Sequence, residues 1–424
     1  MRSSTSSSDG APPGAGPGAP GDALGTDAPR PGAPGAYAPP RAPRGPVPFG
    51  GYAPPAPADR APDALDAARR APWEAPPAPE RAVPALDFGR AARVALVCFA
   101  VLLGAWEAYW RTQGAVPGTV NSDGLWARAR RQVNAGDPRA TVFIGSSRTL
   151  SNVQLPVWAR LEGRPPVQLA LEGTSPIGAL EDLAADTAFR DRRLVVGVTP
   201  PLFFTGFAYR QGVVDRARKE TPSQRAGQWL GMTLVEPFLA FQDPDFGLFT
   251  VLARQPWPQR PGAEFRRMPP KLFVHSADRN ARMWARLERD TAYQRVVQQI
   301  WARNFRPPPG PPPPGPPPAE AQIARAVRAV AALRARGVEV VFVRHPSSGP
   351  FLAAEQAGFP RAATWDVLLS RTGARGVHFE DHPQLQGMRM PEWSHMSAAD
   401  ADRYTAALYP LVARPVAAAV GAAR

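Results

Sequence analysis

The stretch ATVFIGSSRTL, residues 140–150, reads as a short buried strand that ends in a polar turn. The run from Thr141 to Ile144 is apolar or β-branched and precedes a glycine, which is typical of a strand buried on both faces of a parallel sheet. Ser146 and Ser147 then lie beyond the carboxyl end of the strand, where reactive groups gather in open α/β sheets. The sequence leaves two interpretations: a polar turn that starts a helix, or a serine nucleophile that needs a base and an oxyanion site.

Strand-like and helix-like segments alternate along residues 140–424. Strands are predicted at 141–145, 167–173, 193–199 and 338–346, and helices at 150–163, 176–189, 319–337 and 397–420. Apolar strands separated by helices predict an α/β fold with a parallel sheet flanked by helices. Ser397, followed by Asp400, has the pattern of a capping box at the start of the last helix.

Two segments interrupt this alternation. Residues 205–305 are irregular and rich in Trp and Arg, with the clearest helical periodicity at 276–305, so we expect a helical insertion that packs over the sheet or shapes a cleft. The run PPPGPPPPGPPP, residues 307–318, predicts a proline-rich loop, because proline fits neither a helix interior nor a central strand. A ligand for SH3-like modules is the alternative role of this loop. The α/β pattern resumes after it, so one domain spans the insertion.

A different composition precedes this domain. Residues 1–90 are mostly Ala, Pro, Gly and Ser, which predicts a disordered arm, because burial could not offset the entropy lost on ordering it. The apolar run VALVCFAVLLGAWEAYW, residues 94–110, reaches the minimum length of a bilayer-spanning helix, about 17 residues. We therefore expect a transmembrane anchor at 91–112 and a connector at 113–139. A buried helix of a soluble domain is the alternative.

The residues around the apolar run predict its orientation. Aromatic side chains at its carboxyl end, Trp106, Tyr109 and Trp110, are typical of a membrane boundary. Arginines lie mostly before the run, at positions 60, 69, 70, 81, 90 and 93, and basic residues favour the cytoplasmic side. We therefore expect a single-pass protein of the inner (cell) membrane, with a cytoplasmic amino terminus and an extracytoplasmic main domain.

The charge and the cysteine count exclude other classes. The net charge of +14 comes from scattered arginines and not from basic blocks with interleaved aromatic residues, so no nucleic-acid partner is expected. The chain has one cysteine, Cys98, which excludes an intrachain disulfide and a thiolate zinc site.

Two later segments offer partners for a nucleophilic serine. Gly173 follows a strand and precedes a predicted helix start, so backbone N–H groups there could face an anion. In MPEWSHMSAAD, Glu392 precedes His395 by three residues, and a carboxylate at that spacing can turn back to hold one imidazole nitrogen and leave the other free for a serine. The plain alternatives are a turn serine, a histidine satisfied by local backbone at the helix start, and a surface acid.

These three blocks, in this order, resemble the SGNH/GDSL-like hydrolase superfamily over residues 140–420. They are most similar to its membrane-anchored branch, which is found with bacterial surface-polysaccharide and cell-wall acylation systems. The resemblance implies an SGNH-like (flavodoxin-like) fold, with Ser147 as nucleophile, His395 as base and Glu392 in the place of the usual aspartate. It also implies an oxyanion hole formed by the amides of Ser147 and Gly173.

One block departs from the family pattern. The Asn that normally adds a donor to the oxyanion hole is absent from VVGVTPP, residues 195–201, where Thr199 is the alternative donor. A lost donor of this kind costs about 2.7–4 kcal/mol of transition-state stabilisation if nothing replaces it.

The resemblance therefore implies an esterase or O-acyltransferase that acts on acyl esters, acetyl above all, of a surface glycan. A membrane acyltransferase is the protein partner that this reading suggests, and no cofactor or metal is required. The alternative is a non-catalytic binding or assembly protein of the cell envelope that keeps the fold.

Two arginines near the strand ends are candidates for the substrate rim. Arg148 follows the serine, and a structural ion pair is its plainer alternative. Arg344 begins RHPSSGPF, residues 344–351, which ends a strand, and a turn is the plainer interpretation of that segment. A metal site at His378, Asp381 and His382 is disfavoured, because their spacing fits no familiar zinc pattern.

Overall fold

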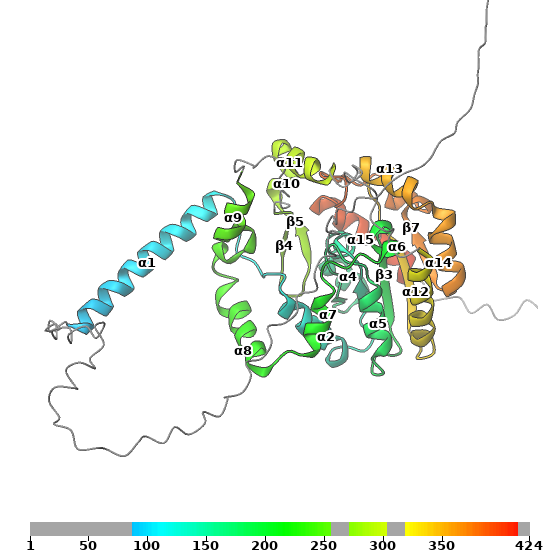
Figure 1. Cartoon of the computed structure of the whole chain (residues 1–424), viewed down its shortest axis with the longest axis horizontal. Helices are drawn as coiled ribbons and strands as arrows, with labels where there is room; N and C mark the ends of the chain where they lie inside the picture. The colour runs from blue at the N-terminus through cyan, green and yellow to red at the C-terminus, as the bar shows by residue number, and fades with distance from the viewer. Residues whose placement is uncertain (1–86, 256–270, 303–318, 414–424) are drawn as a thin grey trace, which may run out of the picture. The chain divides into compact units, whose positions relative to one another are not determined.

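The computed structural model describes residues 87–255, 271–302 and 319–413 (Figure 1). The disordered arm predicted for residues 1–90, except its last few residues, and the proline-rich loop at 307–318 lie outside the described residues.

A parallel sheet lies at the centre of the α/β domain. Its strands are β1 (Val142–Ile144), β2 (Val167–Gln168), β3 (Arg193–Val198), β6 (Glu339–Arg344) and β7 (Arg375–His378), in the order β2-β1-β3-β6-β7. All four neighbouring pairs are parallel. Without the hairpin β4–β5, this is the flavodoxin-type order 2-1-3-4-5, in which the crevice at the carboxyl ends of β1 and β3 is the usual ligand site. The predicted parallel α/β sheet is confirmed; β7 was not predicted.

Helices cover both faces of the sheet because alternate strand residues point to opposite sides. On one face, Val142 and Ile144 pack in a core with α2 (Asp123–Ala135), α5 (Ile177–Ala185), α6 (Pro200–Thr205), α7 (Gly212–Arg218), α12 (Ala319–Arg334) and α14 (Trp365–Thr372). On the other face, Phe143 packs with α4 (Leu155–Glu162) and α15 (Ala398–Ala413). α3 (Ser147–Asn152) begins directly beyond β1, and α13 (Gly349–Gly358) follows β6.

The segment 113–139 is more than a connector. It contains α2, whose Trp126 is buried in the core and donates its indole N–H to the carbonyl of Leu169 at 3.0 Å. α2 therefore belongs to the α/β domain, and the domain begins before residue 140.

The insertion contains helices and a hairpin. Besides α7, which packs in the core described above, its helices and strands include α8 (Pro222–Leu230), α9 (Leu248–Arg254), β4 (Phe273–His275), β5 (Ala281–Met283), α10 (Ala285–Arg289) and α11 (Thr291–Ala302). The helix expected at 276–305 therefore starts only at Ala285. The physical reason is Arg279, which turns the chain at φ 67° and buries its guanidinium against the carbonyls of Gln168 and Ala170. These contacts at the end of β2 override the helical periodicity.

One helix in the described part of the chain, α1 (Phe88–Thr112), is long and apolar enough to cross a membrane. Its side chains are mostly exposed, and Trp110 at its carboxyl end is buried. The Glu107 carboxylate accepts hydrogen bonds from the backbone N–H groups of Ala240 and Phe241, at 2.9 and 3.1 Å. The end of α1 is thereby attached to the insertion.

Candidate active site

The opening stretch distinguishes its two serines by burial. Every residue from 140 to 150 is buried except Ser147, which is partly exposed at the start of α3. The Ser146 hydroxyl is fully buried and shares a 2.6 Å hydrogen bond with the Thr199 hydroxyl. Ser147 is therefore the serine that a substrate could reach.

A histidine from the far end of the chain meets Ser147. His395 Nε2 lies 2.9 Å from Ser147 Oγ, and His395 Nδ1 lies 2.8 Å from Glu392 Oε1. The same carboxylate oxygen accepts the backbone N–H of His395 at 2.5 Å. If Nδ1 carries the ring proton and donates it to the carboxylate, Nε2 presents a lone pair to the serine hydroxyl, which is the arrangement of a nucleophile, a base and an orienting acid.

Helix α3 holds the histidine loop at three points. Besides the Ser147–His395 contact, Arg148 Nε donates to Ser394 Oγ at 3.1 Å, and the Asn152 side chain accepts the backbone N–H of Met396 at 3.1 Å. Residues at the two ends of α3 thus contact three consecutive residues of the loop, 394–396, and these contacts hold together segments that are distant in sequence.

The loop itself makes a tight turn at Trp393. This residue has φ 72°, a left-handed conformation that costs a non-glycine residue about 1–2 kcal/mol. The Trp393 carbonyl accepts the backbone N–H of Ser348 at 2.9 Å, and this contact helps to hold the turn. The turn brings the Glu392 carboxylate back to the ring of His395.

Trp301 is a site residue that the sequence did not reveal. Its indole N–H donates to Glu392 Oε2 at 2.6 Å, while Oε1 faces His395. Trp301 belongs to α11, and Gln298 of the same helix donates to the carbonyl of Pro391 at 2.8 Å. The insertion therefore orients the acid of the site. The sequence predicts only that the insertion packs over the sheet or shapes a cleft. No sequence pattern connects residue 301 with residue 392, so the contact between Trp301 and Glu392 could not be predicted.

The two other candidate oxyanion residues lie near strand ends. Gly173 follows β2 and has φ 57°, which favours glycine, and its carbonyl accepts the N–H of Tyr209 at 3.3 Å. Thr199 follows β3, but its hydroxyl is engaged with Ser146. The Ser147 N–H, in the first turn of α3, has no acceptor within the helix.

The two arginines expected on the substrate rim are buried instead. Arg148 Nη2 and Arg344 Nη2 contact the Glu355 carboxylate at 2.7 and 2.6 Å, and the three side chains are nearly inaccessible to solvent. Burial alone would raise the pKa of Glu355, but the two guanidinium charges outweigh it and lower that pKa. Burial lowers the pKa of Arg344 to about 10. Since a buried charge requires a partner, the arginines pair with Glu355 and do not form an open rim.

A second histidine lies beside this cluster. His345 is fully buried, with Nδ1 2.9 Å from the Tyr404 hydroxyl and Nε2 3.1 Å from the Thr149 hydroxyl. Burial, together with the charges of Arg148 and Arg344, lowers its pKa to about 3. His345 is therefore neutral at physiological pH.

His378, Asp381 and His382 lie at the end of β7 and in the residues that follow it. Asp381 accepts two hydrogen bonds from Arg361, at 2.5 and 2.8 Å. Burial lowers the pKa of His378 to about 4. Within residues 87–255, 271–302 and 319–413, no three His, Cys, Asp or Glu side chains form a metal-binding group.

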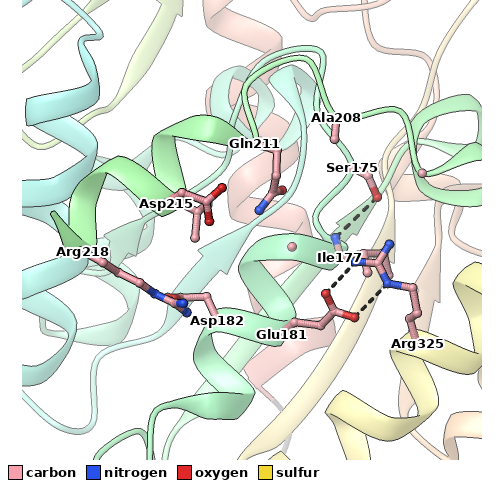
Figure 2. Close-up of a pocket in the computed structure, with 12 residues that line it drawn as sticks. Ser175, Ile177, Glu181, Asp182, Ala208, Gln211, Asp215, Arg218 and Arg325 are labelled. Atoms are coloured by element: carbon pink, nitrogen blue, oxygen red, sulfur yellow. Dashed lines mark hydrogen bonds and ion pairs between the residues drawn. The ribbon is translucent and has the colours of Figure 1, made fainter. Parts of the chain in front are cut away.

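A polar cavity of about 360 Å³ lies elsewhere, beside the start of α5 (Figure 2). Figure 2 shows two arginines on its wall, each near an acid: Arg325 pairs with Glu181 and Arg218 with Asp182. Neither Ser147 nor His395 lines it. This cavity is therefore not the space in front of the serine.

Comparison with known proteins gives no match: no protein-family model fits the chain, and no curated protein sequence is significantly similar to it.

Proposed function

We propose that this protein is a membrane-anchored, extracytoplasmic SGNH-like esterase or O-acyltransferase that acts on acyl esters, acetyl above all, of a surface glycan. The observation that carries the proposal is the line of contacts from Glu392 through His395 to the partly exposed Ser147, at 2.8 and 2.9 Å. The flavodoxin-type strand order supports it, because Ser147 follows the carboxyl end of β1, an interior strand next to β3.

The chemistry follows from these positions. As Ser147 Oγ attacks the ester carbonyl, its proton passes to His395 Nε2, and the Glu392 carboxylate stabilises the imidazolium that forms. The backbone N–H groups of Ser147 and Gly173 would donate hydrogen bonds to the carbonyl oxygen and stabilise the negative charge that develops on it. His395 then returns the proton to the departing alkoxide, which leaves an acyl group on Ser147.

The second half of the reaction decides between hydrolysis and transfer. Water or a glycan hydroxyl gives its proton to His395 Nε2 and attacks the acyl carbonyl, and Ser147 leaves with that proton. Attack by water completes an esterase cycle, and attack by a hydroxyl completes an O-acyltransferase cycle. For transfer, a membrane acyltransferase is the partner that would supply the acyl group.

The proposed location rests on α1. The apolar run 94–110 would cross the inner (cell) membrane, with the arginine-containing arm in the cytoplasm and the α/β domain outside. The attachment of the insertion to Glu107 supports a domain that sits close to the membrane surface.

The test is ester hydrolysis by the purified full chain, measured with p-nitrophenyl acetate and with an O-acetylated polysaccharide. We expect Ser147→Ala to reduce turnover to background. Ser146→Ala is the matched control, because it removes the neighbouring hydroxyl and its bond to Thr199, at a cost of about 1 kcal/mol of stability, and leaves the nucleophile in place. Equal turnover by the wild type and Ser147→Ala would contradict the proposal.

One observation favours a second candidate, a non-catalytic binding or assembly protein with this fold. The usual amide donor is replaced by Thr199, whose hydroxyl is already bonded to Ser146. If the folded wild type hydrolyses no ester but binds the polysaccharide, this second function holds.

A further inference from the structure

The insertion exposes a group of large apolar side chains. They lie on α8, on the wider helical turn that continues it (Gly231–Val235), on the residues that follow, and on α9. We call them the apolar ledge: Trp229, Leu230, Leu234, Phe238, Leu248 and Phe249. Phe249 is 85% exposed and Leu234 is 59% exposed. Large exposed apolar side chains that gather on one segment of a folded domain are a feature of interaction sites.

The same segment uses its other side to hold the domain. Met232 is buried, and Glu236 Oε2 accepts the backbone N–H of Val120 at 2.8 Å. Leu230, Leu234 and Phe238 recur at intervals of four residues and share the opposite, exposed side. The segment is therefore amphipathic, with its polar contacts directed to the protein.

The acidic residues between the two halves of the ledge are paired within the protein. Asp243 is paired with Lys271, and Asp245 pairs with Arg254 at 2.6 Å. The ledge can therefore be buried without leaving these two carboxylates unpaired.

The position of the ledge along α1 identifies its occupant. Glu107 lies one helical turn before Arg111, at the end of the apolar run, and it binds the backbone of Ala240 and Phe241. Arg111 donates to the carbonyl of Phe238 at 3.0 Å. If α1 crosses a bilayer, this level of the helix is the boundary between acyl chains and headgroups.

We propose that the apolar ledge lies in the interfacial layer of the same bilayer that α1 crosses. This inference rests on the proposed membrane anchor. Residues 238–241 contact α1 at the boundary level, so the adjacent side chains of the ledge enter the headgroup region, where apolar faces of amphipathic helices are buried. α1 and the ledge together then fix how the domain is oriented above the membrane.

The experiment measures depth in the membrane with the full chain in phosphatidylcholine vesicles. Cys98 is the only cysteine and lies in the apolar run of α1, so a fluorescent label on it reports the anchor. In a Cys98→Ser background, separate Phe249→Cys and Leu234→Cys variants carry an environment-sensitive label on the ledge. Leu161→Cys, on α4 and also exposed, is the matched control.

We expect the labels at 249 and 234 to emit at shorter wavelength than the label at 161 and to lose fluorescence to nitroxides near the lipid headgroups. The label at 161 should be unaffected by them. In the wild-type chain, quenching of the Cys98 label by nitroxides deep in the acyl chains would show that the anchor is in the membrane. If the labels at 249 and 234 are then not quenched, the proposed position of the ledge is wrong and the anchor stands. An unquenched Cys98 label would overturn the anchor itself. If the labels at 249 and 234 emit at shorter wavelength only at high protein concentration and are not quenched by the lipid nitroxides, the ledge is covered by a second copy of the chain. That result would contradict the inference.

Discussion

Helix α3 presents two hydroxyl groups to two histidines, and the two pairs differ in what surrounds them. Ser147 meets Nε2 of His395 at 2.9 Å, and Thr149, two residues later, meets Nε2 of His345 at 3.1 Å. Each ring nitrogen Nδ1 also has an oxygen partner. Distances alone therefore do not separate a reactive pair from a structural one.

Charge and access separate them. Behind His395 stands a carboxylate, Glu392, which stabilises a protonated imidazole, whereas the partner behind His345 is the neutral hydroxyl of Tyr404. The guanidinium groups of Arg148 and Arg344 further oppose protonation of His345. Since Ser147 is also the partly exposed residue of the two, its pair is the one that the proposed proton transfer would use.

The largest expected effect comes from replacing the group behind each histidine. Glu392→Gln keeps the shape but removes the charge, and we expect ester hydrolysis to fall by about four orders of magnitude, as when a triad acid loses its charge. Tyr404→Phe should leave turnover nearly unchanged and cost about 1 kcal/mol of stability. Initial rates and urea unfolding of both variants measure this contrast. Comparable rates in the two variants would erase the distinction between the pairs.

Removing the charge of Glu355 tests the structural cluster. Glu355→Gln leaves Arg148 and Arg344 buried without an anion, and we expect the free energy of unfolding to drop by about 3–5 kcal/mol. Glu380→Gln, which neutralises an exposed acid, is the control and should change it by less than about 0.5 kcal/mol. Urea denaturation gives both values. If Glu355→Gln is as stable as the control variant, the two arginines do not depend on Glu355.

The role of Trp301 separates positioning from packing. Trp301→Phe keeps an aromatic ring but removes the hydrogen bond to Glu392, worth about 1.5–3 kcal/mol to a charged acceptor, so kcat should fall about ten- to hundredfold with little change in KM. Trp284→Phe removes another indole hydrogen bond of the insertion, to the carbonyl of Gly114, and should affect stability without affecting kcat. Steady-state kinetics of both variants provide the test, and a wild-type kcat for Trp301→Phe would assign the tryptophan to packing alone.

The smallest effect is a pH dependence of stability. In the folded state the pKa of His345 is lowered to about 3. As the pH falls below about 6.5, the ordinary pKa of histidine, the unfolded chain therefore binds a proton at His345 that the folded protein does not bind. The contribution of His345 is thus fully present above about pH 6.5, and roughly 1.4 kcal/mol of it is lost one pH unit below that value.

Stability curves of the wild type and His345→Gln between neutral and mildly acidic pH isolate this contribution. His378 titrates in the same direction in both proteins and cancels in the difference. Parallel curves would show that His345 is not held neutral.

Local patterns in the sequence predicted the parts of the fold and site that short segments determine. The strands β1, β3 and β6 are continuous apolar runs, and the spacing of Glu392 and His395 allowed the carboxylate to turn back to the ring. β7 could not be predicted, because Val377 is the one apolar side chain in its sequence, RGVH. Its backbone pairing with β6 makes this segment a strand.

The remainder depends on contacts between distant segments. Because Arg148 and Arg344 lie near strand ends, the sequence predicts them at the substrate rim. They are buried because both pair with Glu355 on α13, and no local pattern predicts this contact. In the same way, Trp301 approaches Glu392 through the packing of the insertion, which no periodicity encodes.

The most direct test of the central claim, that His395 activates Ser147, is labelling of the folded chain with a fluorophosphonate, followed by mass spectrometry of its peptides. We expect one adduct on Ser147 in the wild type, none on Thr149, and none on Ser147 in His395→Gln. A folded wild-type protein without an adduct on Ser147, or an adduct that persists in His395→Gln at the wild-type rate, would contradict the claim.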